Sequence, residues 1–190
     1  MKIAICKLKS KSPYSQSKFI DVDKLQKELP KDFEKRVWRE RMHKDEETGC
    51  VMIPPMVFGN CIKDAAKYLS ISVPGGGKAT YTKNFSAGVF VSEPIILPIK
   101  VEDVPGEWLL VPSDGKKNGT GSKVQKCFGR IDKWDCTVEF SIFDDIITQE
   151  VFEQVLKAAG MLIGIGRFRP RNGGFYGKFE VVSVDFRTIC

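Results

Sequence analysis

The sequence has little histidine and no closely paired cysteines, which limits the metal and redox chemistry open to the chain. Its single histidine is His43, and its six cysteines contain no Cys-x-x-Cys pair. Neither a zinc site of the usual paired spacing nor a disulfide scaffold is favoured. We expect no metal and no cofactor, and we predict reduced, mostly buried thiols. The cysteines stand at positions 6, 50, 61, 127, 136 and 190.

A long apolar run is also lacking. No apolar stretch of the sequence approaches the ~20 residues that are needed to span a bilayer. The segment Met1–Lys7 lacks the apolar core of a signal peptide, and its alternation of apolar and basic residues is typical of a strand. These absences predict a cytoplasmic protein that has no membrane partner.

Basic residues are in excess and are unevenly distributed. The 190 residues carry a formal net charge of +6, and 42% of them are hydrophobic, which is typical of a globular domain with its own core. Residues 1–18 contain five lysines and no acid, and residues 112–133 contain six basic residues against two acidic ones. A polyanion partner would explain such clusters, although solubility alone also produces them. We predict one domain over residues 1–190.

The most informative stretch is the glycine-rich, basic segment Ile163–Phe179. Its seventeen residues include five glycines, three arginines, one lysine and four aromatic residues. Glycine lets another backbone approach closely, arginine suits phosphate oxygens, and an aromatic ring can stack on a base. We therefore predict a nucleic-acid-binding loop in which the arginines hold phosphates and an aromatic residue stacks. The candidate residues are Arg167, Arg169, Arg171, Phe175 and Tyr176.

Within this segment, Arg167 and Arg169 are favoured because they alternate around Phe168. In extended chain, both arginines would face the ligand while Phe168 packs inward. The alternative is a hairpin whose glycines serve turn geometry and whose arginines are solvated, because a glycine-rich run is a weak motif by itself.

A second basic loop is predicted at residues 112–126. This stretch combines lysines with glycines and other turn-forming residues, as expected of a hairpin tip. Lys116, Lys117 and Lys123 would bind phosphates from a mobile arm. A loop of this polarity could equally be an excursion without function.

The sequence Pro74–Lys78 resembles a phosphate-binding loop only superficially. A helix precedes it where a strand is required, and Ala79 follows the lysine where serine or threonine is required. We therefore exclude a nucleotidase. We predict instead a flexible segment at 74–85, in which Tyr81 and Thr82 are extended.

Hydrophobic periodicity predicts an α+β chain, in which an antiparallel sheet is packed by two main helices. Apolar residues repeat at helical spacing over 56–70, and Thr148 is a plausible N-cap for a helix that ends near residue 162. A further helix with Asp32 as its N-cap is expected at 32–42. Strands are expected at 2–9, 49–55, 87–97, 107–111, 136–143 and 179–186.

Two segments, which cover about a fifth of the chain, have counterparts in a known family. Ile53–Ala66 resembles the strand-to-helix element of the RAMP superfamily, the RNA-binding subunits of CRISPR effector complexes, and Gly164–Gly177 resembles its C-terminal glycine-rich signature. The resemblance implies a modified ferredoxin-like or RRM-like fold with a basic hairpin insertion, and it adds Lys63 to the nucleic-acid-binding candidates. Pro55 stands where the family usually has glycine.

The residues and the resemblance together predict a backbone-type subunit that binds single-stranded nucleic acid, and the resemblance alone favours RNA over DNA. From the residues we predict that it performs no catalysis. Its partners would be copies of itself, in a filament-like array, or other CRISPR-type subunits, and it could be a solitary phage-encoded relative. The alternative is a protein-interaction module, such as a phage-encoded CRISPR inhibitor or decoy, or an assembly protein. A third hypothesis is a ribonuclease that depends on His43.

Catalytic and metal-binding groups are not favoured by the residues. A lone histidine after a charged helix is more often a surface residue than a general base. Asp144 and Asp145 could bind a metal with Asp185 or Glu139. Adjacent aspartates of an extended chain point to opposite sides, however, so we expect these two to cap the loop before Thr148.

Overall fold

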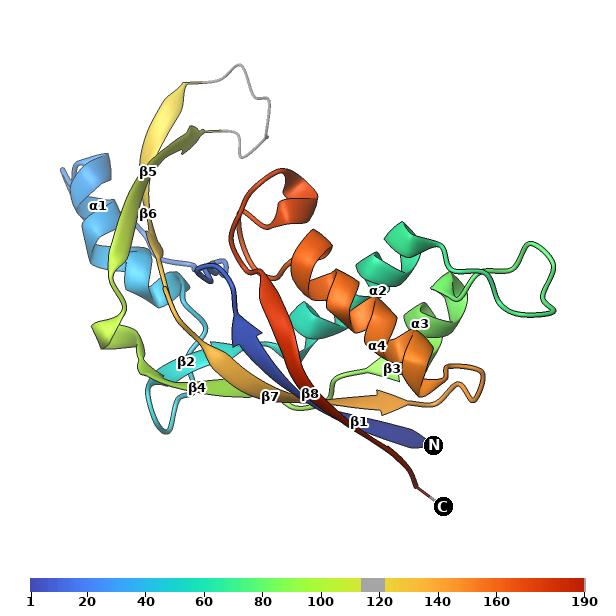
Figure 1. Cartoon of the computed structure of the whole chain (residues 1–190). Coiled ribbons are helices and arrows are strands. Elements are labelled where there is room, and N and C mark those ends of the chain that lie inside the picture. Colours follow the sequence, from blue (N-terminus) through green and yellow to red (C-terminus); the bar gives the residue numbers. More distant parts are fainter. Residues whose placement is uncertain (114–121, 190) are drawn as a thin grey trace.

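The fold is built on a four-stranded antiparallel sheet, seen in the computed structural model of the chain (Figure 1). The structure describes residues 1–113 and 122–189. The strands are β1 (Lys2–Ser10), β3 (Val89–Phe90), β7 (Asp135–Ile142) and β8 (Phe179–Thr188), in the spatial order β3-β7-β1-β8. Numbered along the chain, this order is 4-1-3-2, the arrangement of the ferredoxin-like βαββαβ fold. The predicted α+β class is confirmed.

Two helices cover one face of this sheet: α2 (Pro55–Leu69) after β2, and α4 (Gln149–Ala158) after β7 (Figure 1). Aromatic rings of both helices pack edge-to-face on rings of the sheet. The ring centroids of Phe152 of α4 and Phe140 of β7 are 5.4 Å apart, and those of Phe58 of α2 and Phe179 of β8 are 5.9 Å apart. The predicted N-cap of α4 is present, because the Thr148 hydroxyl accepts a hydrogen bond from the Val151 N–H at 3.4 Å.

Among the helices of residues 1–113 and 122–189, none covers the opposite face of the sheet. Along β1 and β7 buried residues alternate with solvent-facing ones, as the strand period of two requires. The register places Ile5 between Glu139 and Asp185, and Lys7 between Thr137 and Ser183. In these central rows of the described sheet, the open face therefore carries aliphatic, charged and hydroxyl side chains.

The remaining elements are inserted between the sheet strands. A pair of short strands, β2 (Cys50–Ile53) and β4 (Ile95–Lys100), extends the core, and the hairpin of β5 (Gly106–Pro112) and β6 (Lys123–Gly129) projects from it (Figure 1). The first helix, α1 (Pro30–Val37), lies beside the hairpin and continues into the 3-10 turn η1 (Trp38–Arg41). Another 3-10 turn, η2 (Val101–Asp103), joins β4 to β5. Within the described residues, no helix is long and apolar enough to cross a membrane.

The structure corrects the sequence prediction around residues 81–97. Thr82 begins a helix, α3 (Thr82–Gly88), and the expected single strand at 87–97 is divided between β3 and β4, which belong to different sheets. The helix is fixed by tertiary contacts, because Phe85 is fully buried and the Asn84 amide donates to the Asp144 carboxylate at 2.8 Å. A Cβ on Gly88 would lie 2.7 Å from that of Asp144, so α3 ends against the β7–α4 connection.

A smaller correction concerns the start of α1. The helix begins at Pro30, and its N-cap position is Leu29, where Asp32 was expected. Proline is favoured in the first helical turn because its missing N–H would have no partner there. Asp32 instead lies in the first turn, where a carboxylate interacts favourably with the helix dipole.

Candidate nucleic-acid interface

The glycine-rich segment 163–178 forms a compact loop between the π-helical turn η3 (Ala159–Ile163) and β8. It folds back on itself, since the Ile165 N–H donates to the Gly177 carbonyl at 3.0 Å and the Tyr176 N–H donates to the Phe168 carbonyl at 2.9 Å. A 3-10 turn, η4 (Pro170–Asn172), forms its tip. We call this segment the glycine loop.

At two positions of the loop, another segment of backbone lies so close that only glycine fits. A Cβ on Gly177 would lie 1.8 Å from the Ile165 carbonyl oxygen, and one on Gly166 would lie 2.3 Å from that of Ser15. Both residues have φ near +70°, a region that other residues enter only at a cost. The glycine loop is also anchored to the segment after β1, because Arg167 N–H donates to Ser15 O at 2.8 Å and Gly177 N–H donates to Pro13 O at 2.7 Å.

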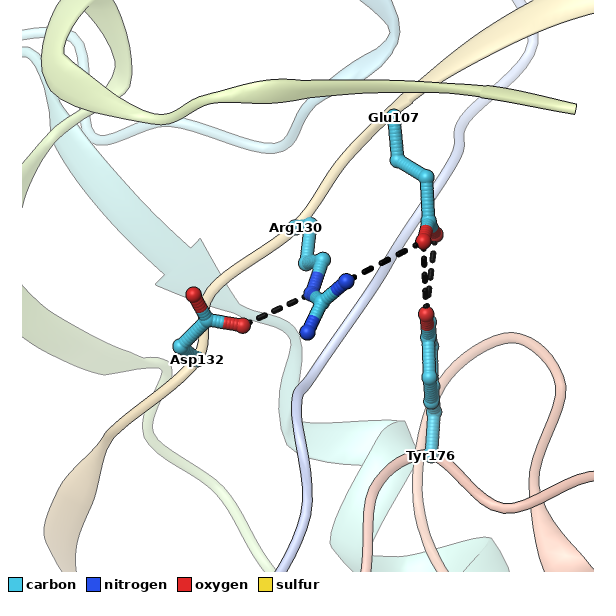
Figure 2. A network of polar contacts seen from close by, with 4 residues as sticks. All are labelled: Glu107, Arg130, Asp132 and Tyr176. Carbon is cyan, nitrogen blue, oxygen red and sulfur yellow. Dashed lines mark hydrogen bonds and ion pairs between the residues drawn. The ribbon is translucent and has the colours of Figure 1, made fainter.

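A polar network joins the glycine loop to the base of the β5–β6 hairpin (Figure 2). The Tyr176 hydroxyl lies 2.9 Å from each oxygen of the Glu107 carboxylate. Arg130 donates to Glu107 at 3.2 Å and to Asp132 at 2.7 Å. Burial and the hydrogen bond to Glu107 raise the pKa of Tyr176. Loop and hairpin are thus held together through side chains, and the Tyr176 hydroxyl is already engaged.

Arg167 points from the glycine loop toward the hairpin. Its guanidinium lies over the Phe128 ring of β6, 3.8 Å from the ring centroid, and 5.2 Å from that of Phe168. Its buried Nε has no hydrogen-bond partner, and among the described residues no carboxylate forms an ion pair with it. Burial and the neighbouring Arg41 lower the pKa of Arg167. This cation is therefore held in place without a neutralising acid.

Arg169 and Arg171 lie on another side of the loop. Both approach the same carboxylate of α2, with Arg169 3.5 Å and Arg171 3.3 Å from Asp64. The expectation that Arg167 and Arg169 share one face of an extended segment is wrong, because Phe168 between them has φ of +53° and is not extended. Their part in ligand binding stays a prediction.

The other predicted residues are spread over the surface. Phe175 is 58% exposed, and the Lys178 ammonium lies 4.7 Å above its ring. Lys63 of α2 lies over the Phe90 ring at 5.1 Å, and Lys123 is exposed at the start of β6. Two further predicted residues, Lys116 and Lys117, lie outside the described residues. Arg167 and Tyr176 are thus the two candidates that meet the hairpin base.

The residues considered for catalysis are engaged in other ways. Burial and nearby Lys18 lower the pKa of the half-buried His43. Asp144 accepts hydrogen bonds from Asn84 at 2.8 Å and from the Ile146 N–H at 3.2 Å, which is the expected capping role. In the described part of the chain, no three histidine, cysteine or acidic side chains lie close enough to hold a metal ion.

Sequence reasoning missed the groups that fix the loop to the hairpin. Glu107, Arg130 and Asp64 look like ordinary surface charges, because their partners are distant in sequence. Tyr176 and Glu107, for example, are 69 residues apart. The indirect signals were a tyrosine within a segment that has five glycines and a hairpin rich in charge, and these do not specify which residues pair.

Comparison with known proteins gives information at the level of structure alone. No family model and no curated protein matches the sequence. A solved chain that does match comes from the "Cryo-EM structure of the Type III-B Cmr-beta bound to cognate target RNA", with a TM-score of 0.55 and 10% identity. The match covers 97% of the present chain and 60% of the solved one. The likeness is one of fold. It supports the predicted fold, and the chain spans 60% of its neighbour's length.

Proposed function

We propose that the chain binds single-stranded RNA as a non-catalytic subunit of the RAMP type. The observation that carries the proposal is Arg167, whose guanidinium the glycine loop holds over the Phe128 ring without an acidic partner among the described residues. An arginine in such a position is ready for an external anion, and its planar fork suits phosphate oxygens. The structural neighbour belongs to an RNA-bound complex, which agrees with this choice of polyanion.

The surface used would be the glycine loop and the hairpin, and not the open face of the sheet. RRM domains stack bases on aromatic residues of their sheet. Here the central rows of the open face carry residues such as Ile5, Lys7 and Glu139. By contrast, the exposed ring of Phe175 and the basic residue Lys123 belong to the loop and the hairpin.

Binding is tested by fluorescence anisotropy with a labelled single-stranded RNA, the same DNA sequence and an RNA duplex. We expect micromolar or tighter binding to the single-stranded RNA, and a dissociation constant that rises steeply with salt because counterions are released. Absence of binding at low salt would contradict the proposal. Equal affinity for RNA and DNA would restrict it to single-stranded nucleic acid in general.

Absence of catalysis is part of the proposal and is tested separately. We expect the RNA to remain intact during incubation with the protein, with or without divalent metal ions. Cleavage that disappears in His43→Ala would establish the ribonuclease hypothesis instead. Cleavage that persists in His43→Ala would point to a contaminating enzyme, which a second purification checks.

We further propose head-to-tail association of the chain along RNA, because a contact that repeats without closing produces a filament. Light scattering on a long oligonucleotide should reveal particles that grow with protein concentration. A strict one-to-one complex on an RNA several times the site length would contradict it.

A protein-interaction module is the second candidate, and one feature of the hairpin favours it. Trp108 and Leu110 of β5 are 38% and 68% exposed and, two residues apart on one strand, lie on the same face. Exposed apolar residues that gather on one face are typical of protein contact sites. Leu110→Asp should leave RNA affinity unchanged if the hairpin binds a protein partner through this face.

A further inference from the structure

A small basic pocket lies where the glycine loop, the hairpin and the end of α1 meet. Its volume is about 250 Å³, and its polar lining includes Ser17, Arg41, Lys126 and Arg167, with Phe128 as part of its apolar wall. The three cations come from three different elements, η1, β6 and the glycine loop. Three positive charges at one place repel one another, so a nearby negative charge is needed to offset the repulsion.

A buried carboxylate that contacts two of these cations offsets part of the repulsion. Glu34 of α1 is 1% exposed, and it accepts hydrogen bonds from the Arg41 guanidinium, from the Lys126 ammonium at 3.2 Å and from the Cys127 N–H at 2.9 Å. Burial opposes ionisation of Glu34, but these hydrogen bonds outweigh it and hold its pKa below the usual value. Glu34 thus fixes two of the cations and the backbone of β6.

Glu34 does not neutralise the third cation. One of its oxygens receives Arg41 and Cys127, and the other receives Lys126. Arg167 makes neither a hydrogen bond through its buried Nε nor an ion pair with a carboxylate among the described residues. Within the part of the chain that the structure describes, three cations therefore face one carboxylate, and the excess positive charge is concentrated around Arg167.

We propose that this pocket is a binding site for one phosphate group, held jointly by Arg41, Lys126 and Arg167. The pocket exceeds the size of a phosphate, and two guanidinium groups and an ammonium offer donors that match tetrahedral oxygens. Glu34 is a positioning residue that orients Arg41 and Lys126 toward the anion. The identification of the ligand as an RNA phosphate rests on the proposed function, whereas the site itself rests on the pocket.

The first experiment titrates inorganic phosphate into the full chain by isothermal titration calorimetry, at constant ionic strength with chloride as the reference anion. We expect saturable binding that weakens about tenfold in Lys126→Gln and in Arg167→Gln, the loss typical of one charge-assisted contact. Lys78→Gln, which removes an exposed lysine of the segment 73–80, should bind like the parent. No phosphate binding by the parent, or equal binding by all variants, would overturn the site.

Folding of each variant is checked by its thermal unfolding. Should Arg167→Gln fail to fold, Lys126→Gln alone decides the matter, because this side chain is 36% exposed and belongs to the hairpin surface. Glu34→Gln separates positioning from plain support. Glu34→Gln should weaken phosphate binding even if the solubility and secondary structure of this variant are unchanged. Unchanged phosphate binding would remove Glu34 from the proposal.

The second experiment distinguishes the source of the phosphate with three RNAs of one sequence: 5′-phosphorylated, 5′-hydroxyl and circular. An internal phosphodiester predicts equal affinities and equal losses in Lys126→Gln, and a terminal phosphate predicts that the phosphorylated RNA alone binds tightly. Either result supports the site. If RNA binds but Lys126→Gln and Arg167→Gln bind it like the parent, the pocket proposal fails while RNA binding stands. If phosphate binds and RNA does not, the pocket stands and RNA binding fails.

Discussion

The chain contains two glycine-rich stretches with basic residues, and the structure uses them differently. In the segment 73–80, Gly75 and Gly77 have positive φ, but a Cβ on either would meet nothing within 4 Å. In the glycine loop, a Cβ on Gly177 would meet a backbone oxygen at 1.8 Å. Gly75 and Gly77 serve conformation alone, whereas Gly177 also serves close packing. Richness in glycine therefore accompanies an exposed connection in one place and a hydrogen-bonded, closely packed loop in the other.

The largest expected effect compares one substitution in the two stretches. Gly177→Ala combines positive φ with a backbone clash, and it should lower the free energy of unfolding by about 3–5 kcal/mol. Gly77→Ala has a similar φ without the clash and should cost about 1–2 kcal/mol. Urea unfolding of both variants measures the difference. Equal losses would mean that the glycine loop relaxes as freely as the segment 73–80, and the contrast would be lost.

The next effect compares one basic residue from each stretch, Arg167 and Lys78. Arg167→Gln should weaken RNA binding by about 1–3 kcal/mol, because a partly desolvated guanidinium would lose its phosphate. Lys78→Gln, in the exposed stretch, should change RNA affinity by less than about 0.5 kcal/mol. Fluorescence anisotropy at fixed salt measures both. If the two variants lose the same affinity, the interaction depends on net charge and not on the loop.

Attachment of the glycine loop to the hairpin gives the third effect. Tyr176→Phe removes the hydroxyl that binds Glu107 and should lower the free energy of unfolding by about 1–2 kcal/mol, as for hydrogen bonds to charged groups. Tyr68→Phe is the matched control, since Tyr68 is 64% exposed on α2. Thermal unfolding compares the two. A loss no greater than that of the control would show that the loop is held by its backbone contacts alone.

Neutralising Asp64 should have the smallest effect, and this effect should be a gain in RNA affinity. Asp64→Asn releases Arg169 and Arg171 from their shared carboxylate, so RNA affinity should rise by up to about 1 kcal/mol if these arginines approach the ligand. The same substitution in an Arg169→Gln, Arg171→Gln background should bring no gain. Unchanged affinity of Asp64→Asn would leave Arg167 as the functional arginine of the loop.

Much of the ferredoxin-like core could be predicted because its elements have strong local patterns. The stripe of α2, with residues such as Phe58 and Ile62 buried, and the alternation along β1 predict their structures without the rest of the chain. By contrast, β3 has two residues, and α3 depends on the burial of Phe85 in a core built by distant segments. Elements of this kind are determined by tertiary contacts, which override local propensity.

The candidate site could be predicted in outline but not in its pairings. Composition identified the glycine loop, yet it gave no sign that Arg169 and Arg171 would share Asp64. The hydrogen bond from Cys127 to Glu34 joins residues 93 apart, and no local pattern specifies such a pair. The direction in which Arg167 points depends on the left-handed conformation of Phe168, which a sequence of apparently extended residues does not indicate.

The pairing of β1 with β8 also determines where the molecule can be cut and joined. Lys2 lies opposite Thr188, and the Ile189 N–H donates to the Met1 carbonyl at 2.9 Å, so the two ends of the described chain are neighbours (Figure 1). The glycine loop enters β8 at Phe179, about 30 Å away at the usual rise per strand residue. A short linker could therefore join the ends, with new termini opened at the exposed Gly75–Gly77 turn. Such a circular permutant would carry a fluorophore or an affinity tag near α3, leaving the β5–β6 hairpin and the glycine loop in one uninterrupted piece.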